Sequence, residues 1–242
     1  MGLRGDMRIE TAAGPVEISK LADCTVSNPD FSEVVLSWIG NKFFVSEITN
    51  IRLHGVEQLF EVTLDDKQVV YASASSQFVM KSGCRKTPPE LVPGDSLLPL
   101  YLDEDAHGYP TYSVPGRAVK RKISRLMAEW ITGGPLGKGT YVEHIDGDRK
   151  NYHPSNLKIT INKAMAKRSH KNKLVKAYDA AQALLDECST ASPLMAKIVG
   201  RKGKGNHKVE SVRPGMLGEV YAASVRSAGS LSVSGVFLEL PS

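Results

Sequence analysis

The sequence has little cysteine and no long apolar run, and both absences exclude whole classes of protein. No stretch of about 18 apolar residues occurs among its 242 residues, so no membrane-spanning helix is expected. The first residues lack the apolar segment of a secretory signal peptide. The three cysteines stand far apart without a repeated spacing, which argues against a disulfide framework or a cysteine-based zinc site. We therefore expect a reducing, intracellular setting and no membrane partner.

Positive charge is concentrated in the middle of the chain. Residues 111–208 hold 20 basic and 7 acidic residues, a net charge of +13, while the remaining residues carry −8. A basic block between acidic flanks indicates a middle module that meets a polyanion, with nucleic acid as the favoured partner. A solvated basic face is the alternative that the charge alone leaves open.

The first hundred residues read as β-rich. Short runs of branched and aromatic residues, separated by Gly, Asp and Asn, predict strands at 16–18, 33–38 and 42–48. Residues 59–72 have the pattern of a hairpin with a polar turn. Strands are predicted again near the other end, at 219–225 and 231–238.

The middle of the chain has a mixed pattern. Residues 101–116 read as a polar connector, and apolar spacing over 117–131 predicts a helix that ends at a Gly-Gly-Pro sequence. Residues 140–161 predict two short strands around a polar loop, and a long helix is expected over 162–188, before a cationic linker at 198–207. The order is that of an insertion into a β domain.

The two ends of the chain carry motifs that resemble those of inteins, which have the Hint fold. The opening Gly-Leu-Arg-Gly-Asp-Met at residues 2–7 resembles the first intein block, residues 60–72 resemble the second, and residues 219–238 resemble the closing blocks. The resemblance covers about 100 residues in the correct order. It implies a horseshoe-like β fold, and an unrelated β domain with common Gly-Asp turns is the alternative.

The residues that perform splicing in inteins are replaced here. Splicing needs a nucleophilic side chain at the first intein residue, where this chain has Gly2. The resemblance places Ser73 and Ser76 at the Thr and His that polarise the scissile bond. It places Gly229 at a closing-block His, and Glu239 and Leu240 at the terminal His-Asn pair. The resemblance therefore implies the fold and denies the activity.

Residues 141–157 resemble the core motif of HNH homing endonucleases. The resemblance implies that His144 is the base that activates water, and that Glu143 coordinates Mg²⁺ or Mn²⁺. Asn156 would orient the imidazole or support the loop. The family's second metal ligand falls near Ala164 or Met165, neither of which suits a hard cation, and Asn162 becomes the ligand if the alignment shifts by two residues.

DNA contact is expected from cationic side chains on the two predicted helices that flank this motif. Such side chains neutralise phosphates and carry little sequence information. The candidate DNA-binding residues are Arg117, Lys120, Arg121, Lys122, Arg125, Lys163, Lys167, Arg168 and Lys171. A solvated amphipathic helix is the alternative for the Lys-rich stretch.

Taken together, the patterns predict a mainly β Hint (intein-like) horseshoe with an inserted α+β HNH (ββα-metal) domain. The predicted boundaries are 2–104 for the first Hint part, 105–205 for the HNH domain and 206–242 for the second Hint part. The leading hypothesis is an intein-derived HNH endonuclease that nicks or cuts double-stranded DNA in the cytoplasm of a bacterial or phage-infected cell. The alternatives are a protein-splicing intein, inactivated or engineered and joined to host-protein segments, and a catalytically dead DNA-binding relic.

Overall fold

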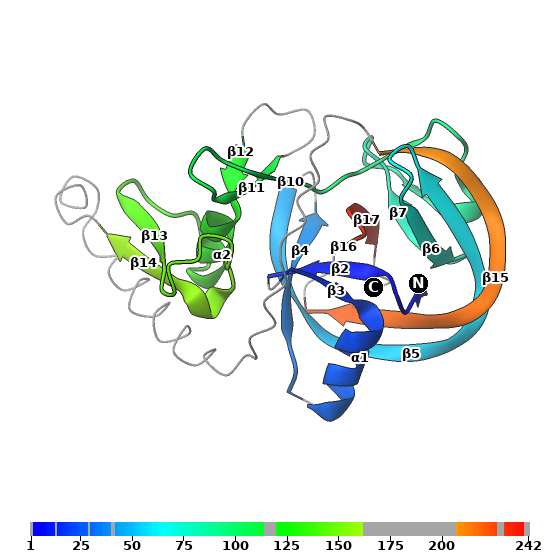
Figure 1. Cartoon of the computed structure of the whole chain (residues 1–242), viewed down its shortest axis with the longest axis horizontal. Coiled ribbons are helices and arrows are strands. Elements are labelled where there is room, and N and C mark those ends of the chain that lie inside the picture. Colours follow the sequence, from blue (N-terminus) through cyan, green and yellow to red (C-terminus); the bar gives the residue numbers. More distant parts are fainter. Residues whose placement is uncertain are drawn as a thin grey trace.

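The computed structural model describes residues 2–12, 14–28, 30–39, 42–113, 120–161, 207–226 and 230–239. Most of these residues lie in strands (Figure 1). The first strands are β1 (Leu3–Arg4), β2 (Arg8–Thr11), β3 (Gly14–Glu17), β4 (Glu33–Ile39), β5 (Lys42–Leu64), β6 (Val69–Ser73), β7 (Gln77–Val79), β8 (Arg85–Lys86) and β9 (Ser96–Leu97). The later strands are β10 (Tyr101–Glu104), β11 (Pro110–Ser113), β12 (Lys120–Lys122), β13 (Thr140–His144), β14 (Leu157–Ile161), β15 (His207–Val225), β16 (Ser230–Val233) and β17 (Val236–Glu239). The described part also holds two α-helices, α1 (Ile18–Ser27) and α2 (Ile123–Ile131), and two 3-10 turns, Pro88–Glu90 and Pro154–Asn156.

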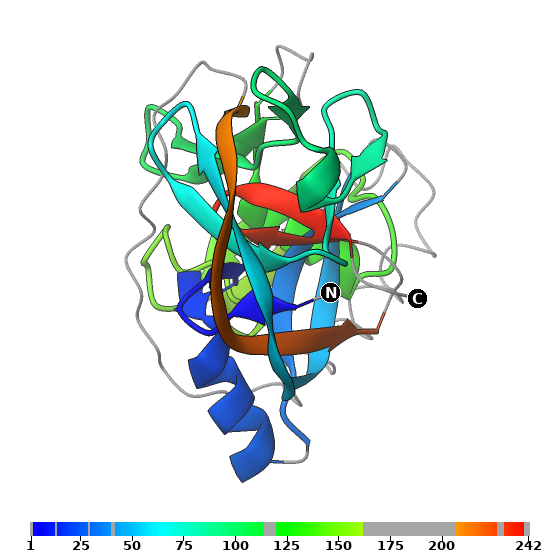
Figure 2. The ribbon, with the colours of Figure 1, turned by 90° about the vertical axis from the view of Figure 1, so that its right-hand side faces the viewer.

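Two long strands form the frame of the molecule. β5 and β15 pair antiparallel from Leu64↔Val209 to Ile48↔Val225, and they curve together around β1, β2 and β6 (Figures 1 and 2). Gly55 has a φ of 145°, which favours glycine, and the register of β15 shifts between Pro214 and Leu217. These irregularities allow two paired strands to bend instead of continuing as a flat ribbon.

A first apolar core lies inside this frame. It joins side chains from both ends of the chain, including Leu3, Ile9, Val62, Phe78 and Leu231, all 0% exposed. Such burial contributes roughly 25 cal/mol for each Å² of apolar surface removed from water. The core therefore holds the N-terminal strand β1 between β6 and β15.

A second apolar core joins the frame to the middle of the sequence. Phe43 and Phe237 from the frame pack with Tyr112 of β11, with ring centroids 5.6 Å (Phe43 to Phe237) and 5.0 Å (Phe43 to Tyr112) apart. Ile123 and Met127 of α2 complete this core. Side chains from both sides of residue 104 thus share one apolar cluster.

Several predicted elements are confirmed, and others differ. The hairpin at 59–72 is present as the β5–β6 pair, and 140–161 forms the β13–β14 hairpin. The polar connector at 101–116 is instead the β10–β11 hairpin, because Leu102 and Tyr112 reach the second core. Within 117–131, residues 120–122 form β12 beside β11, so the helix begins only at Ile123. The predicted long helix at 162–188 lies outside the described residues.

Glu33 at the start of β4 makes the stability of the fold depend on pH. Burial raises the pKa of the Glu33 carboxyl to about 7, although the backbone N–H of Val34 donates to it at 3.2 Å. A raised pKa means that the folded state binds this proton more tightly than the unfolded state. The contribution is fully present below about pH 4.5 and is lost as pH rises through about 7.

We expect the free energy of unfolding to fall by on the order of 2 kcal/mol between pH 4.5 and 8 because of Glu33. Urea titrations across this range should show a flatter profile for Glu33→Gln. The exposed Glu219→Gln serves as the matched control and should leave the profile unchanged. An identical slope in the natural chain and in Glu33→Gln would contradict the assignment.

Candidate functional site

The peptide groups of Gly2 are held at the start of β1 by a tight turn that follows β6. The Gly2 N–H donates to Ser73 Oγ at 3.0 Å and to Ser76 Oγ at 3.3 Å. The Gly2 carbonyl accepts from the Ser73 N–H at 2.8 Å and from Ser76 Oγ at 3.1 Å. Both serines are 0% exposed, so these bonds form away from water. The turn therefore binds residue 2 through the N–H and carbonyl groups of Gly2.

The turn adds a small cluster of hydroxyl groups around this peptide. Ser73 Oγ lies 3.0 Å from Ser75 Oγ and 3.3 Å from Ser76 Oγ. Hydroxyl groups orient a peptide well because each can donate and accept. They are poor proton donors or bases at neutral pH, and Gly2 brings no side chain to act as a nucleophile. The arrangement can hold and polarise the bond before Gly2, and it lacks a group that attacks this bond.

The C-terminal strand reaches the same turn. Glu239 of β17 pairs with Gln77, which directly follows Ser76, and its carboxylate forms an ion pair with Arg85. Ala222, which the resemblance to inteins places at a closing-block Asp, pairs with Arg52 on the neighbouring strand β5. Two further degenerate splicing positions, Gly229 and Leu240, lie outside the described residues. The fold thus brings Gly2, Ser73 and Ser76 together, with Glu239 beside them.

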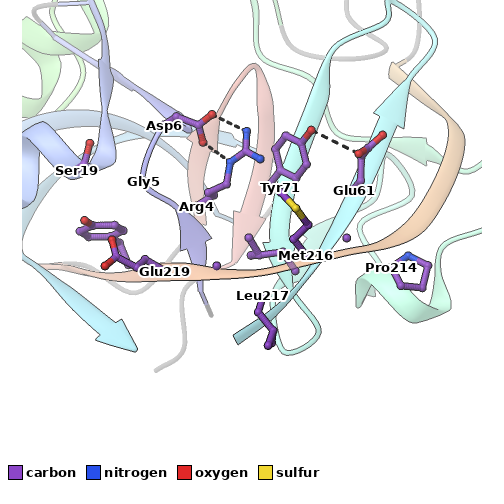
Figure 3. Close-up of a pocket in the computed structure, with 14 residues that line it drawn as sticks. Arg4, Gly5, Asp6, Ser19, Glu61, Tyr71, Pro214, Met216, Leu217 and Glu219 are labelled. Carbon is purple, nitrogen blue, oxygen red and sulfur yellow. Dashed lines mark hydrogen bonds and ion pairs between the residues drawn. The ribbon is translucent and has the colours of Figure 1, made fainter. Parts of the chain in front are cut away.

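A pocket of about 760 Å³ lies at the end of β1 and is lined by residues of β5, β6 and β15. Figure 3 shows Arg4 between Asp6 and Tyr71. The guanidinium carbon of Arg4 lies 3.3 Å from the centroid of the Tyr71 ring, and both Arg4 nitrogens that face Asp6 are 2.6 Å from its carboxylate oxygens. The ion pair holds the pKa of the Asp6 carboxyl below its usual range. No sequence pattern indicates this pocket, in which the Arg4 guanidinium and the Asp6 carboxylate neutralise each other.

The HNH-like residues lie on the β13–β14 hairpin, and Asn156 does not orient the imidazole. Glu143 and His144 are neighbours on β13, so their side chains leave opposite faces of the strand. The Asn156 amide donates to Asp146 Oδ1 and to the Asn151 carbonyl, both at 2.8 Å. Its Oδ1 accepts from the Asp146 N–H at 3.0 Å. Asn156 therefore supports the loop between the strands, which is the other role that the sequence left open.

His144 is partly withdrawn from solvent. Its Nε2 atom is buried without a hydrogen bond in the described structure, and its ring centroid lies 5.7 Å from that of Tyr109. Burial lowers the pKa of His144, although Asp146 and Asp148 act in the opposite direction. The alternative ligand Asn162, together with Ala164 and Met165, lies outside the described residues. In the part that the structure describes, three or more metal-ligating side chains gather only at Asp65, Asp66 and His207.

The predicted cationic surface is largely neutralised where the structure describes it. Lys120 forms an ion pair with Asp103, and Lys122 lies 3.3 Å from Asp105. These pairs arise because β12 and β10 lie on either side of β11, which sets acidic and basic side chains across one small sheet. The structure thus corrects the expectation of a cation-crowded helix at 117–131.

The remaining candidate DNA-binding residues divide into two groups. Arg125 of α2 is 3.4 Å from Glu129 and donates to the Leu136 carbonyl at 2.7 Å, while Arg121 lies beside the Tyr112 hydroxyl. The second group lies outside the described residues and consists of Arg117, Lys163, Lys167, Arg168 and Lys171.

None of the described helices is long and apolar enough to cross a membrane.

Solved structures of inteins match the chain over its whole length. The G-1F mutant of the Ssp DnaB mini-intein variant M86 is 9% identical, covers 100% of this chain and 99% of its own, and gives a TM-score of 0.51. A DnaB intein from Synechocystis sp. PCC 6803 is 10% identical, covers 100% and 99%, and gives a TM-score of 0.50. Identities this low show the fold alone. No model of a known family matches the sequence, and no curated protein matches it.

These comparisons overturn the leading functional hypothesis. The structures that match the full chain include mini-inteins, which lack an endonuclease domain. The predicted HNH endonuclease function is therefore wrong, and nothing in the matches supports an inserted HNH domain or cleavage of DNA. The motif that suggested this function lies on the β13–β14 hairpin, outside the frame (Figure 1), and its Asn156 amide bonds to Asp146 and Asn151 of the hairpin loop. The chain has the mainly β Hint fold of the inteins.

Proposed function

We propose that this chain is a protein-splicing domain of the intein type whose splicing site is inactive in the natural sequence. One observation carries the proposal: the N–H of Gly2 points at Ser73 and Ser76 at 3.0 and 3.3 Å. These serines stand where the resemblance to inteins places the residues that polarise the scissile bond. A site that still binds the peptide but has lost its reactive groups fits a degenerate splicing domain.

The reactive groups that splicing needs are missing at Gly2, Ser76 and Leu240. Gly2 cannot move the preceding acyl group onto a side chain, because it has none. Ser76 replaces a group that titrates near neutral pH with a hydroxyl that does not. Leu240 lacks the amide nitrogen with which a terminal asparagine cyclises and releases the following chain. A host-protein segment joined to either end of the natural chain would therefore stay attached.

A fusion between two marker proteins tests the proposal, with the second marker joined directly after residue 240. We expect the natural chain to remain an unprocessed fusion. Glu239→His with Leu240→Asn should release the C-terminal marker over about a day, judged by gel and mass spectrometry. In this step the asparagine amide nitrogen attacks its own carbonyl carbon, the peptide bond to the next residue breaks, and that residue's amine takes the proton.

The matched control is Glu239→His with Leu240→Gln, which presents the same amide one methylene further away and should release no marker. Circular dichroism of each variant verifies that it folds. A folded asparagine variant that releases no marker would contradict a splicing ancestry for this site.

A further inference from the structure

The space beside Gly2 is filled by one side chain of β15. A Cβ atom built on Gly2 would lie 2.7 Å from Val220 Cβ, 2.9 Å from its Cγ2 and 3.1 Å from its Cγ1. Separations under about 3.0 Å do not occur between real carbon atoms of this kind, so any side chain at residue 2 requires a shift. Val220 is 0% exposed and is therefore packed on all sides.

The backbone at Gly2 does not itself demand glycine. Gly2 is absent from the glycines that have a positive φ, such as Gly55 and Gly147. The φ of Gly2 therefore gives no reason for glycine, whereas the lack of space beside Val220 does. The restriction therefore comes from the neighbour, Val220.

Neither partner can easily move away. Gly2 is fixed by its four hydrogen bonds to Ser73 and Ser76. Val220 is fixed by strand pairing on both sides, with Arg4 of β1 and with Gly55 of β5. A change of rotamer does not relieve the contact, because the nearest atom is the Cβ of Val220, which no side-chain rotation displaces.

We infer that Val220 is the residue that restricts position 2 to glycine, and that it closes the place which a splicing nucleophile would occupy. The claim about the nucleophile rests on the proposed function. The claim that Val220 excludes a side chain at residue 2 rests only on the contact between the two residues. It predicts that replacing Gly2 by cysteine is not sufficient to restore reactivity, because the thiol has no room until residue 220 is reduced in size.

A double-mutant cycle tests the steric part without reference to splicing. We expect Gly2→Ala to lower the folding equilibrium constant about 10- to 100-fold in the natural chain. In a Val220→Gly background, the same change should lower it by no more than about twofold. Gly134→Ala is the matched control, because a Cβ at Gly134 meets nothing within 4 Å. The measurement is urea unfolding followed by circular dichroism.

An equal effect of Gly2→Ala in both backgrounds would overturn the inference. If Val220→Gly does not fold, Val220→Ala takes its place. It removes both Cγ atoms and lets the strands adjust, so it should relieve part of the cost. The Cβ atom of residue 220 remains in that background, so the natural chain then decides the matter: a cost of Gly2→Ala no larger than that of Gly134→Ala would overturn the inference.

A cleavage assay links the contact to chemistry. A marker protein is fused directly before residue 2 in the Gly2→Cys, Ser76→His variant, with and without Val220→Gly. The cysteine thiol attacks the preceding carbonyl carbon, a C–S bond replaces the C–N bond, and the thiol proton passes to the released amine. Added dithiothreitol then exchanges with the thioester and frees the marker. We expect release only when Val220→Gly is present.

The outcomes separate the two ideas. Equal release with and without Val220→Gly would overturn the role of Val220 and leave the proposed function intact. Coupling in the stability cycle without release in any variant would contradict the proposed function, while the steric role of Val220 would stand.

Discussion

Phe237→Ala is expected to lower the free energy of unfolding by about 3–5 kcal/mol and to destabilise the frame and the β10–α2 region together. Phe237 is 0% exposed and packs against Phe43 and Trp38, with ring centroids 5.6 and 6.2 Å away. The same core contains Tyr112 of β11 and Met127 of α2. Removing the ring leaves a cavity where the two regions meet, so neither can keep its packing.

The two tryptophans allow this coupling to be measured. Trp38 lies on β4 of the frame and Trp130 lies on α2. Urea unfolding of Trp38→Phe and Trp130→Phe, followed by fluorescence, reports each region separately. We expect coincident transitions in both reporters, and a joint shift when Phe237→Ala is added. Val26→Ala, at a side chain 83% exposed, is the control. A separate transition at Trp130 would show that the middle region is an independent domain.

Tyr152→Ala is expected to cost about 3–5 kcal/mol, whereas Tyr152→Phe should cost only about 1 kcal/mol. Tyr152 lies in the loop between β13 and β14, yet its side chain is 1% exposed and belongs to the second core. Its hydroxyl donates to the Thr11 carbonyl of β2 at 3.3 Å. The ring supplies most of the stabilisation, and the hydroxyl adds one buried hydrogen bond.

The comparison of these two Tyr152 variants by urea unfolding separates packing from hydrogen bonding. The exposed Tyr141→Phe on the same hairpin is the matched control and should change stability very little. Similar, small losses for Tyr152→Ala and Tyr152→Phe would mean that the hairpin does not dock on the frame.

The sequence allowed the β-rich ends to be predicted because their signals are local. Alternation places Phe43 and Val45 inside while Lys42 and Phe44 stay exposed, and a short polar turn follows Leu64. The sequence also allowed the proximity of Gly2, Ser73 and Ser76 to be predicted, because the resemblance to the ordered intein motifs placed them at one site. Their hydrogen bonds agree with that placement.

Other features could not be predicted because they depend on distant partners. Nothing in the local pattern indicates that Asp103 and Asp105 face Lys120 and Lys122, since only the β10–β11–β12 pairing brings them together. The net charge of residues 111–208 therefore overestimates the positive charge that is free to meet a polyanion, because Asp103 and Asp105 lie outside this range and pair with lysines inside it. Val220 is likewise an ordinary strand valine in sequence, and only its approach to Gly2 gives it a role.

The pairing of β5 with β15 has a consequence for the order of events during synthesis. β5 ends at Leu64, and the strand that pairs with it begins at His207. Ser37 likewise donates to the carbonyl of Ser230, 193 residues later. Contacts so distant along the chain form slowly, because a large loop must close before any of them contributes. While the ribosome is still translating the middle of the chain, β5 has no lasting partner along one edge, and the frame closes only after β15 has emerged.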